Sequence, residues 1–246
     1  MPTVTIRPYT EIITQIETLT GLQENQIRAA MAIVHVFEVA SVSGGFHRVG
    51  KIQGDSGGIS YGVFQFSINS GNLGSILTAY VAAPEAKYAA QAAPFALRAA
   101  RRDPTLNDDL HFEQTLKQIG FDPVMQRIQI AYGLQEFGLV AANRFRDLGL
   151  KTALGYGVML DSSVQGAYTK VVQGVRNRKP SLGGDEKTWV TDYLSTRRAW
   201  LTRQGPPLLC TVYRIDTFRR LIEKNNWSLT PPFLARSVMI KQEAIQ

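Results

Sequence analysis

Two carboxylate side chains, Glu38 and Asp55, lie in surroundings of opposite character in this sequence of 246 residues. Glu38 follows the largely apolar run Ile33–Phe37 near the end of a predicted buried helix, whereas Asp55 lies in the glycine-rich turn 54–58. Burial raises the pKa of a carboxyl group, which then stays protonated and can donate its proton, while a solvated carboxylate stays ionised and can activate water. Hydrolysis of a glycosidic bond requires such a pair.

Both residues also have an ordinary interpretation. A glutamate at a helix end is usually solvated, and an aspartate among glycines usually forms a turn. The predicted helix nevertheless carries a polar stripe on one face, because His35, Glu38 and Ser41 recur at helical spacing among apolar residues. Such a stripe can face either a cleft or bulk water.

Composition limits the classes of protein that the chain can represent. The length fits one large domain or two lobes that share a cleft, and 44% hydrophobic residues can bury a substantial core. The single cysteine, Cys210, excludes an internal disulfide framework, and we expect it in the core beside Leu208 and Leu209. We find no HExxH, paired CxxC or phosphate-binding glycine motif, so we expect no metal and no cofactor.

The net charge of +7 favours an anionic partner. The basic residues are scattered, however, and are not interleaved with aromatic residues as in nucleic-acid modules, so we expect no nucleic-acid partner. No apolar run is long enough to span a membrane, and the N-terminus has no signal-peptide pattern. A target outside the cell would then require another export route, or a signal that is no longer part of this sequence. We expect a monomer.

Helical patterns dominate the chain. Residues 1–19 are predicted to form an N-terminal arm, and a helix is predicted from Thr20, with Thr20 as its cap. Residues 43–66 contain seven glycines among short alternating runs, which indicates one or two hairpins. Further helical segments are predicted from about Leu73, in short pieces over 84–104, and over 106–119, 122–145, 156–175, 185–204 and 214–225, before a proline-rich tail.

Five blocks of the sequence occur in a characteristic order. They are Phe37-Glu38, GDSGGISYG at 54–62, LGYGVMLDSSVQGA at 154–167, DEKTWVTDYLSTRRAWL at 185–201 and RIDTFRRLIEKNNWSL at 214–229. The blocks resemble the chitosanases of glycoside hydrolase family 46, within the lysozyme-like superfamily, and the likeness covers most of the chain. It implies a mainly α, two-lobed α+β fold, in which residues 20–246 form one catalytic domain and a small β-hairpin lies beside a cleft near 38–72.

The resemblance also implies roles for individual residues. Inverting hydrolysis of a β-1,4-linked amino-sugar polymer would use Glu38 as general acid, Asp55 as general base and Ser60 to hold the attacking water. Tyr61, Gln65, Asn72 and Gln165 would bind substrate. Asp161 and Gln165 could instead support the Glu38 helix across the core, and we favour that role for Asp161 because a buried aspartate usually has a structural partner.

Departures from the family pattern bear on the substrate. Asn72 stands where the chitosanase loop has an aspartate that binds a substrate amine, and Gln65 is similar to a glutamine of lysozymes and lytic transglycosylases. Because a chain of charge +7 is attracted to anionic peptidoglycan, we favour peptidoglycan as substrate, with chitosan as the alternative. A lytic transglycosylase, in which Asp55 is structural, and a non-catalytic cell-wall-binding protein are further alternatives.

Overall fold

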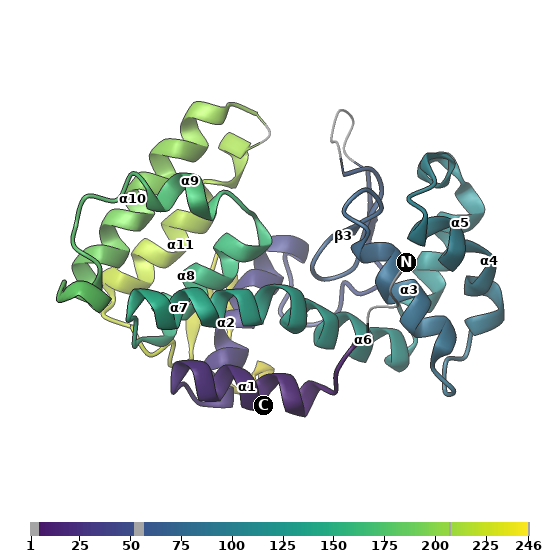
Figure 1. Ribbon diagram of the computed structural model, residues 1–246, viewed down its shortest axis with the longest axis horizontal. Helices are drawn as coiled ribbons and strands as arrows, with labels where there is room; N and C mark the ends of the chain where they lie inside the picture. The colour runs from purple at the N-terminus through teal and green to yellow at the C-terminus, as the bar shows by residue number, and fades with distance from the viewer. Residues whose placement is uncertain (1–4, 52–56, 207, 246) are drawn as a thin grey trace. The chain divides into compact units, whose positions relative to one another are not determined.

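The computed structural model describes residues 5–51, 57–206 and 208–245, and most of them are helical (Figure 1). The chain divides into two compact units. Unit 1 comprises Met1–Ile12 and Ser43–Gln135, and unit 2 comprises Ile13–Val42 and Glu136–Gln246. Among the described residues, no helix is both long enough and apolar enough to cross a membrane.

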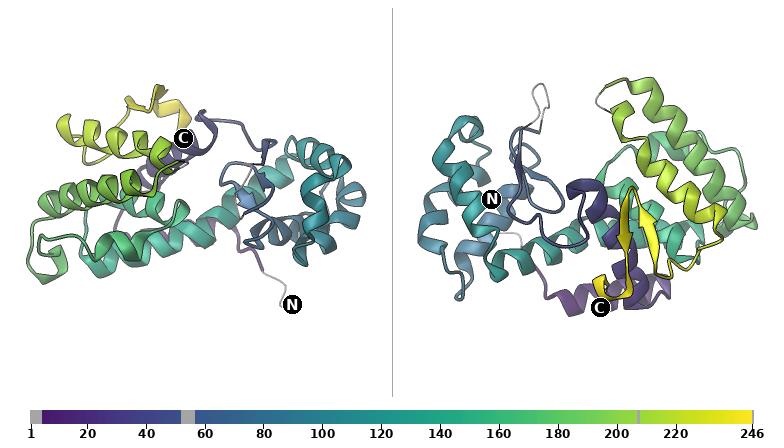
Figure 2. Two further views of the ribbon diagram at one scale, coloured as in Figure 1. Left: turned by 90° about the horizontal axis from the view of Figure 1, so that it is seen from above. Right: turned by 180° about the vertical axis from the view of Figure 1, so that it is seen from behind.

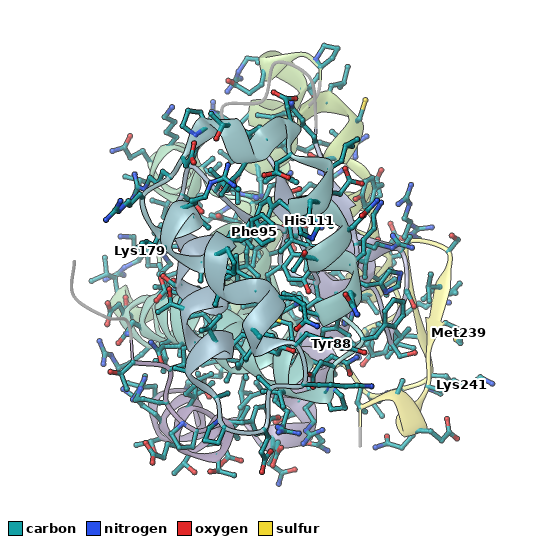
Figure 3. All side chains as sticks on the ribbon, turned by 90° about the vertical axis from the view of Figure 1, so that its right-hand side faces the viewer. Tyr88, Phe95, His111, Lys179, Met239 and Lys241 are labelled. Carbon is teal, nitrogen blue, oxygen red and sulfur yellow. The ribbon has the colours of Figure 1, made fainter. Side chains whose placement is uncertain are left out.

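Unit 1 combines a small antiparallel sheet with helices, and the sheet has the strand order β1-β2-β3. Its strands are β1 (Val49–Gly50), β2 (Ser60–Tyr61) and β3 (Phe66–Ser67), and its helices are α3 (Asn72–Ala82), α4 (Ala89–Ala100), the 3₁₀ helix η1 (Pro104–Asp108), α5 (Leu110–Ile119) and α6 (Pro123–Gly133). Side-chain oxygens of Asp109 and Asp122 cap the amide groups that begin α5 and α6. Phe95 of α4 and His111 of α5 meet edge to face, with ring centroids 5.3 Å apart (Figure 3).

A glycine with positive φ and a buried glutamine shape the sheet of unit 1. Gly62, with φ +72°, leads from β2 into the turn before β3, and its amide donates to the carbonyl of Arg48. A Cβ atom at Gly62 would lie 2.0 Å from Oε1 of Gln129, so only glycine fits there. Gln129 is fully buried, accepts from the amide of Val63 and donates to the carbonyl of Phe46. This glutamine therefore fixes the sheet against α6.

In the described residues of unit 2, the regular structure is helical apart from one C-terminal hairpin. Its elements are most of α1 (Tyr9–Thr20), α2 (Glu24–Val39), α7 (Leu139–Leu148), α8 (Ala153–Val164), α9 (Tyr168–Val172), the 3₁₀ helix η3 (Pro180–Leu182), α10 (Glu186–Gln204), η4 (Leu208–Thr211), α11 (Tyr213–Glu223), β4 (Phe233–Ala235), β5 (Val238–Ile240) and η5 (Gln242–Ala244). A π-helical turn, η2 (Leu134–Gly138), joins α6 to α7. The antiparallel pair β4 and β5 lies beside α2 (Figure 2), and Met239 of β5 is exposed (Figure 3).

The core of unit 2 is built on α2 and α8. Residues Ala153–Ser162 of α8 are all buried, as expected for a helix that is apolar on every side. The hydroxyl of Thr152 accepts from the amide of Gly155 and begins the helix. α8 packs against α2, α7 and α10, so its one carboxylate, Asp161, lies among helices rather than in solvent.

Several local expectations differ from the structure. Thr20 ends α1 instead of capping α2, because its hydroxyl donates to the carbonyl of Ile16, and the N-cap of α2 is Gln23. Most of α1, whose Ile12 is fully buried, lies within residues 1–19, and the interpretation of these residues as an arm stays a prediction. Cys210 is exposed in η4 and does not lie in the core.

Candidate active site

Glu38 lies in the last turn of α2, and its side chain is only 11% exposed. Its Oε1 accepts a hydrogen bond of 2.8 Å from Nη2 of Arg214 in α11. Burial raises the pKa of the Glu38 carboxyl, and the positive charge and hydrogen bond of Arg214 oppose that shift without reversing it. The carboxyl therefore keeps a proton to higher pH than an exposed glutamate does.

A chain of alternating charges continues inward from Glu38. Nη1 of Arg214 donates to Oδ1 of Asp161 at 2.8 Å, and Nη2 of Arg197 in α10 lies 3.7 Å from Oδ2 of Asp161. Asp161 and Arg197 are each 1% exposed. Asp161 thus supports Glu38 through Arg214, as expected for the structural role. The charges of Arg214, Asp161 and Arg197 alternate along this buried row, and their pairing offsets part of the desolvation that each would suffer alone.

Aromatic rings hold Arg214 in place. Its guanidinium lies 5.3 Å from the ring centroid of Phe37 and 6.0 Å from that of Tyr213. The hydroxyl of Tyr213 donates to the carbonyl of Phe37 at 2.9 Å, which ties α11 to the last turn of α2. The orientation of Glu38 therefore depends on contacts made by its helix as well as by its own carboxylate.

Gln165, expected to bind substrate, follows α8 and has both ends of its amide engaged. Its Oε1 accepts from Nη2 of Arg197 at 2.6 Å, and its Nε2 donates to the hydroxyl of Thr211 at 2.6 Å. Arg197 also donates to the carbonyl of Gly166 at 3.0 Å. These contacts favour a supporting role for Gln165 in unit 2.

In unit 1, Ser60 and Gln65 form a small polar group on the sheet. The hydroxyl of Ser60 lies 2.8 Å from Oε1 of Gln65 and 3.1 Å from the carbonyl of Gly50. Nε2 of Gln65 donates to the carbonyl of Gly62 at 2.8 Å. Gln65 adopts φ +51°, a conformation uncommon for a residue other than glycine. The sheet therefore holds both side chains in defined positions.

Tyr61 and Asn72 differ in their access to a ligand. Tyr61, which we expected to line a sugar subsite, is fully buried, and burial raises the pKa of its hydroxyl; its part in substrate binding stays a prediction. Asn72, the first residue of α3, is partly exposed, and its Oδ1 accepts from the hydroxyl of Tyr132 at 3.1 Å. Its amide nitrogen can still donate to a ligand.

Asp55 lies outside the described residues, so its role as general base stays a prediction. Among the residues that the structure describes, no group of three or more histidine, cysteine or carboxylate side chains could hold a metal ion.

The family model for Glycosyl hydrolase family 46 matches residues 32–233. The chain belongs to this family. It is therefore a glycosidase, and the match includes Glu38 and the three charged residues that support it. Arg197 and Arg214 were missing from the predicted site, although each stands in one of the sequence blocks that carry the family resemblance. Their places in these blocks were the available signal.

Known proteins similar to this family 46 chain are chitosanases. A chitosanase from Bacillus subtilis (strain 168) is 23% identical over 245 residues, which cover 93% of this chain and 88% of the relative. The crystal structure of native chitosanase from Bacillus subtilis MY002 is 24% identical, with a TM-score of 0.77, and covers 90% of this chain and 100% of that chain. A Gynuella sunshinyii chitosanase in complex with chitotetraose is 18% identical, with a TM-score of 0.72, over 89% of this chain and 98% of that chain.

The structural likeness confirms the mainly α, lysozyme-like α+β fold with a small antiparallel sheet. The relatives support the chitosanase alternative and give no support to the preference for peptidoglycan.

Proposed function

We propose that this family 46 glycosidase hydrolyses chitosan, with Glu38 as the general acid. The observation that carries the proposal is the buried carboxyl of Glu38, whose raised pKa suits proton donation, in a chain of this family. Chitosan is the substrate suggested by the related chitosanases, one of which was crystallised with 6 GlcN. The proposal replaces peptidoglycan, which we favoured from net charge and from Asn72.

The two oxygens of Glu38 have different tasks in this mechanism. Oε1 accepts the hydrogen bond from Arg214, which leaves Oε2 to carry the transferable proton. Oε2 donates this proton to the glycosidic oxygen as the bond to the leaving sugar breaks. A positioned acid of this kind contributes roughly 10²–10⁴-fold to the rate.

Arg214 acts on the carboxylate that proton transfer leaves behind. Glu38 becomes negative as the leaving group departs, and the guanidinium 2.8 Å away is already oriented to stabilise that charge. Asp161 and Arg197 keep Arg214 in this orientation. The row of charges therefore positions the acid.

Asp55 and Ser60 would act on the attacking water. Asp55, in its glycine-rich segment, is the proposed general base. The hydroxyl of Ser60 has one proton and two lone pairs, so it can donate to Gln65 or Gly50 and still accept from water. Gln65 fixes the serine, and Asn72 is proposed to donate from its amide to a sugar hydroxyl.

The test is incubation of the protein with chitosan and, separately, with purified peptidoglycan, followed by mass spectrometry of the products. We expect glucosamine oligomers with ordinary reducing ends from chitosan. Peptidoglycan fragments in the absence of chitosan cleavage would overturn the substrate proposal. Anhydro ends would overturn hydrolysis in favour of the transglycosylase chemistry.

A further inference from the structure

Tyr213 connects three elements of unit 2 at the end of the helix that carries Glu38. It is the first residue of α11, and its hydroxyl donates to the carbonyl of Phe37 at 2.9 Å. Phe37 directly precedes Glu38, and its ring meets that of Tyr213 edge to face, with centroids 5.7 Å apart. Tyr213 therefore contacts both the backbone and the side chain of the residue next to the proposed acid.

The hydroxyl of Tyr213 satisfies a carbonyl that has no partner within α2. The last carbonyls of an α-helix find no amide donor inside the helix. The cap bond of α2 runs from the amide of Ala40 to the carbonyl of Val36, so the next carbonyl, that of Phe37, requires another donor. Phe37 is buried, and Tyr213 supplies this donor from α11. The hydrogen bond thus fixes the turn of α2 that contains Glu38.

Arg236 holds Tyr213 through two separate contacts. It lies in the turn between β4 and β5, and its guanidinium lies 4.5 Å from the centroid of the Tyr213 ring. Its backbone amide donates to the hydroxyl of the buried Thr217 at 3.1 Å. That hydroxyl donates to the carbonyl of Tyr213 at 3.0 Å. The turn is therefore attached to both the ring and the backbone of Tyr213.

The hairpin that carries Arg236 packs against both helices that Tyr213 joins. β4 contacts α2 and α11, and β5 contacts α2 (Figure 2). Within the part of the chain that the structure describes, no carboxylate forms an ion pair with Arg236. Its positive charge is instead directed at the ring of Tyr213, so hairpin, α11 and α2 meet around this one tyrosine.

We propose that Tyr213 is a positioning residue for Glu38, and that Arg236 supports it from the C-terminal hairpin. The inference rests on the proposed function, because it concerns the acid of that mechanism. Tyr213 keeps the last turn of α2 in place, so that Oε1 of Glu38 stays 2.8 Å from Nη2 of Arg214. An acid held in one orientation transfers its proton more efficiently than one that moves.

Loss of the hydroxyl of Tyr213 has a definite sign for the proton of Glu38. Burial raises the pKa of Glu38, Arg214 lowers it by a smaller amount, and the charge of Asp161 adds to the rise. A loosened helix end weakens the contact with Arg214 and leaves the negative end of α2 unscreened beside Glu38. Both effects disfavour the carboxylate, so the pKa of Glu38 rises further.

The test compares Tyr213→Phe with the wild type, and uses Tyr156→Phe as the matched control. The buried hydroxyl of Tyr156 in α8 also donates to a backbone carbonyl, that of Gly138 at 3.3 Å, which lies outside α2. The pKa of Glu38 is measured by carbon NMR of labelled glutamate carboxyl groups, with Glu38→Gln to assign the signal. The values of kcat and KM for the glucosamine hexamer are measured across pH, and thermal unfolding provides the structural readout.

Tyr213→Phe should raise the pKa of Glu38 and move the alkaline limb of kcat/KM to higher pH, because the acid acts in its protonated form. Loss of one hydrogen bond predicts a fall in kcat of about twofold to tenfold. We expect KM to change less than about twofold, because the tyrosine does not contribute to substrate binding. Tyr156→Phe lowers the melting temperature but leaves the pKa of Glu38, the alkaline limb and kcat unchanged.

Arg236→Gln tests the support from the hairpin, since it removes the cation and keeps the amide that donates to Thr217. It should change the pKa of Glu38 and kcat in the same directions as Tyr213→Phe, by smaller amounts. It should add little in the Tyr213→Phe background, because it acts through the tyrosine. Lys187→Gln is its control, as it removes a cation 5.3 Å from the ring centroid of Trp227, and it should leave Glu38 unchanged.

An unchanged or lower pKa of Glu38 in folded Tyr213→Phe would overturn the inference and leave the proposed function standing. A lower melting temperature with unchanged kcat would assign Tyr213 a structural role and also overturn it. If Tyr213→Phe does not fold, Arg236→Gln at its exposed position decides by the same two readouts. A wild type that does not cleave the glucosamine hexamer would overturn the proposed function, while the NMR titration still decides whether Tyr213 acts on Glu38.

Discussion

Opposing influences set the chemistry of Glu38 at the scale of a single residue. Burial raises the pKa of its carboxyl, and Arg214 lowers it by a smaller amount. A salt bridge alone would have kept the glutamate ionised, which is unsuitable for an acid. The surrounding apolar side chains of α2 are therefore as important to the proposed mechanism as the charged partners.

The raised pKa of Glu38 predicts how its effect on stability varies with pH. Because the folded state holds this proton more tightly than the unfolded state, the contribution of Glu38 is fully present below the unfolded pKa and is lost as pH rises through the folded pKa. The difference in free energy of unfolding, wild type minus Glu38→Gln, should fall as pH rises above about 4.5, the ordinary glutamate value. Urea unfolding at several pH values measures this difference in free energy. A difference that rises with pH would mean that the charge of Arg214 outweighs burial and lowers the pKa of Glu38.

Removal of the charge of Asp161 tests the buried row of charges. Asp161→Asn leaves Arg197 and Arg214 with like charges in a nearly solvent-free interior, and breaking a buried pair costs about 3–5 kcal/mol. Asp147→Asn is the control, because Asp147 is 65% exposed and pairs with Arg146 at the surface. It should change stability by no more than about 1 kcal/mol. Equal effects of the two variants in urea unfolding would contradict the supporting role of Asp161.

At the scale of elements, the sequence is informative where one helix face or one tight turn decides the structure. The apolar run before Glu38 forms α2, and the glycine-rich segment forms the sheet of unit 1, as predicted. Thr20 was misassigned because a threonine can end one helix as readily as it begins the next. The pairing of Glu38 with Arg214 spans 176 residues, a separation that helical spacing cannot reveal.

Gly62 provides a test of the sheet that holds Ser60. Gly62→Ala introduces a Cβ atom 2.0 Å from Oε1 of Gln129 in addition to a strained φ, whereas Gly44→Ala, with φ +82°, meets no atom within 4 Å. Both variants lose the freedom of glycine, so the difference between them reports the clash. We expect Gly62→Ala to be less stable than Gly44→Ala by about 1–3 kcal/mol, as overpacking usually costs. Equal melting temperatures would show that Gln129 moves aside freely.

At the scale of the whole molecule, the fold was more predictable than the substrate. Five ordered blocks spread over most of the chain specify a family, and their positions agree with the match to residues 32–233. The preference for peptidoglycan rested on net charge, but a total of +7 does not describe the local field at Glu38, where two carboxyl and two guanidinium groups alternate. The environment of a single side chain such as Asn72, proposed to bind substrate, cannot be read from the sequence.

The central claim is that Glu38 protonates the leaving oxygen in single-displacement hydrolysis of chitosan. Proton NMR of the first products from a glucosamine hexamer tests it most directly, with Glu38→Gln as the comparison and circular dichroism to verify its fold. The wild type should release new reducing ends as the α anomer, and the folded variant should be slower by about 10²–10⁴-fold. Wild-type turnover by folded Glu38→Gln, or release of the β anomer, would contradict the account.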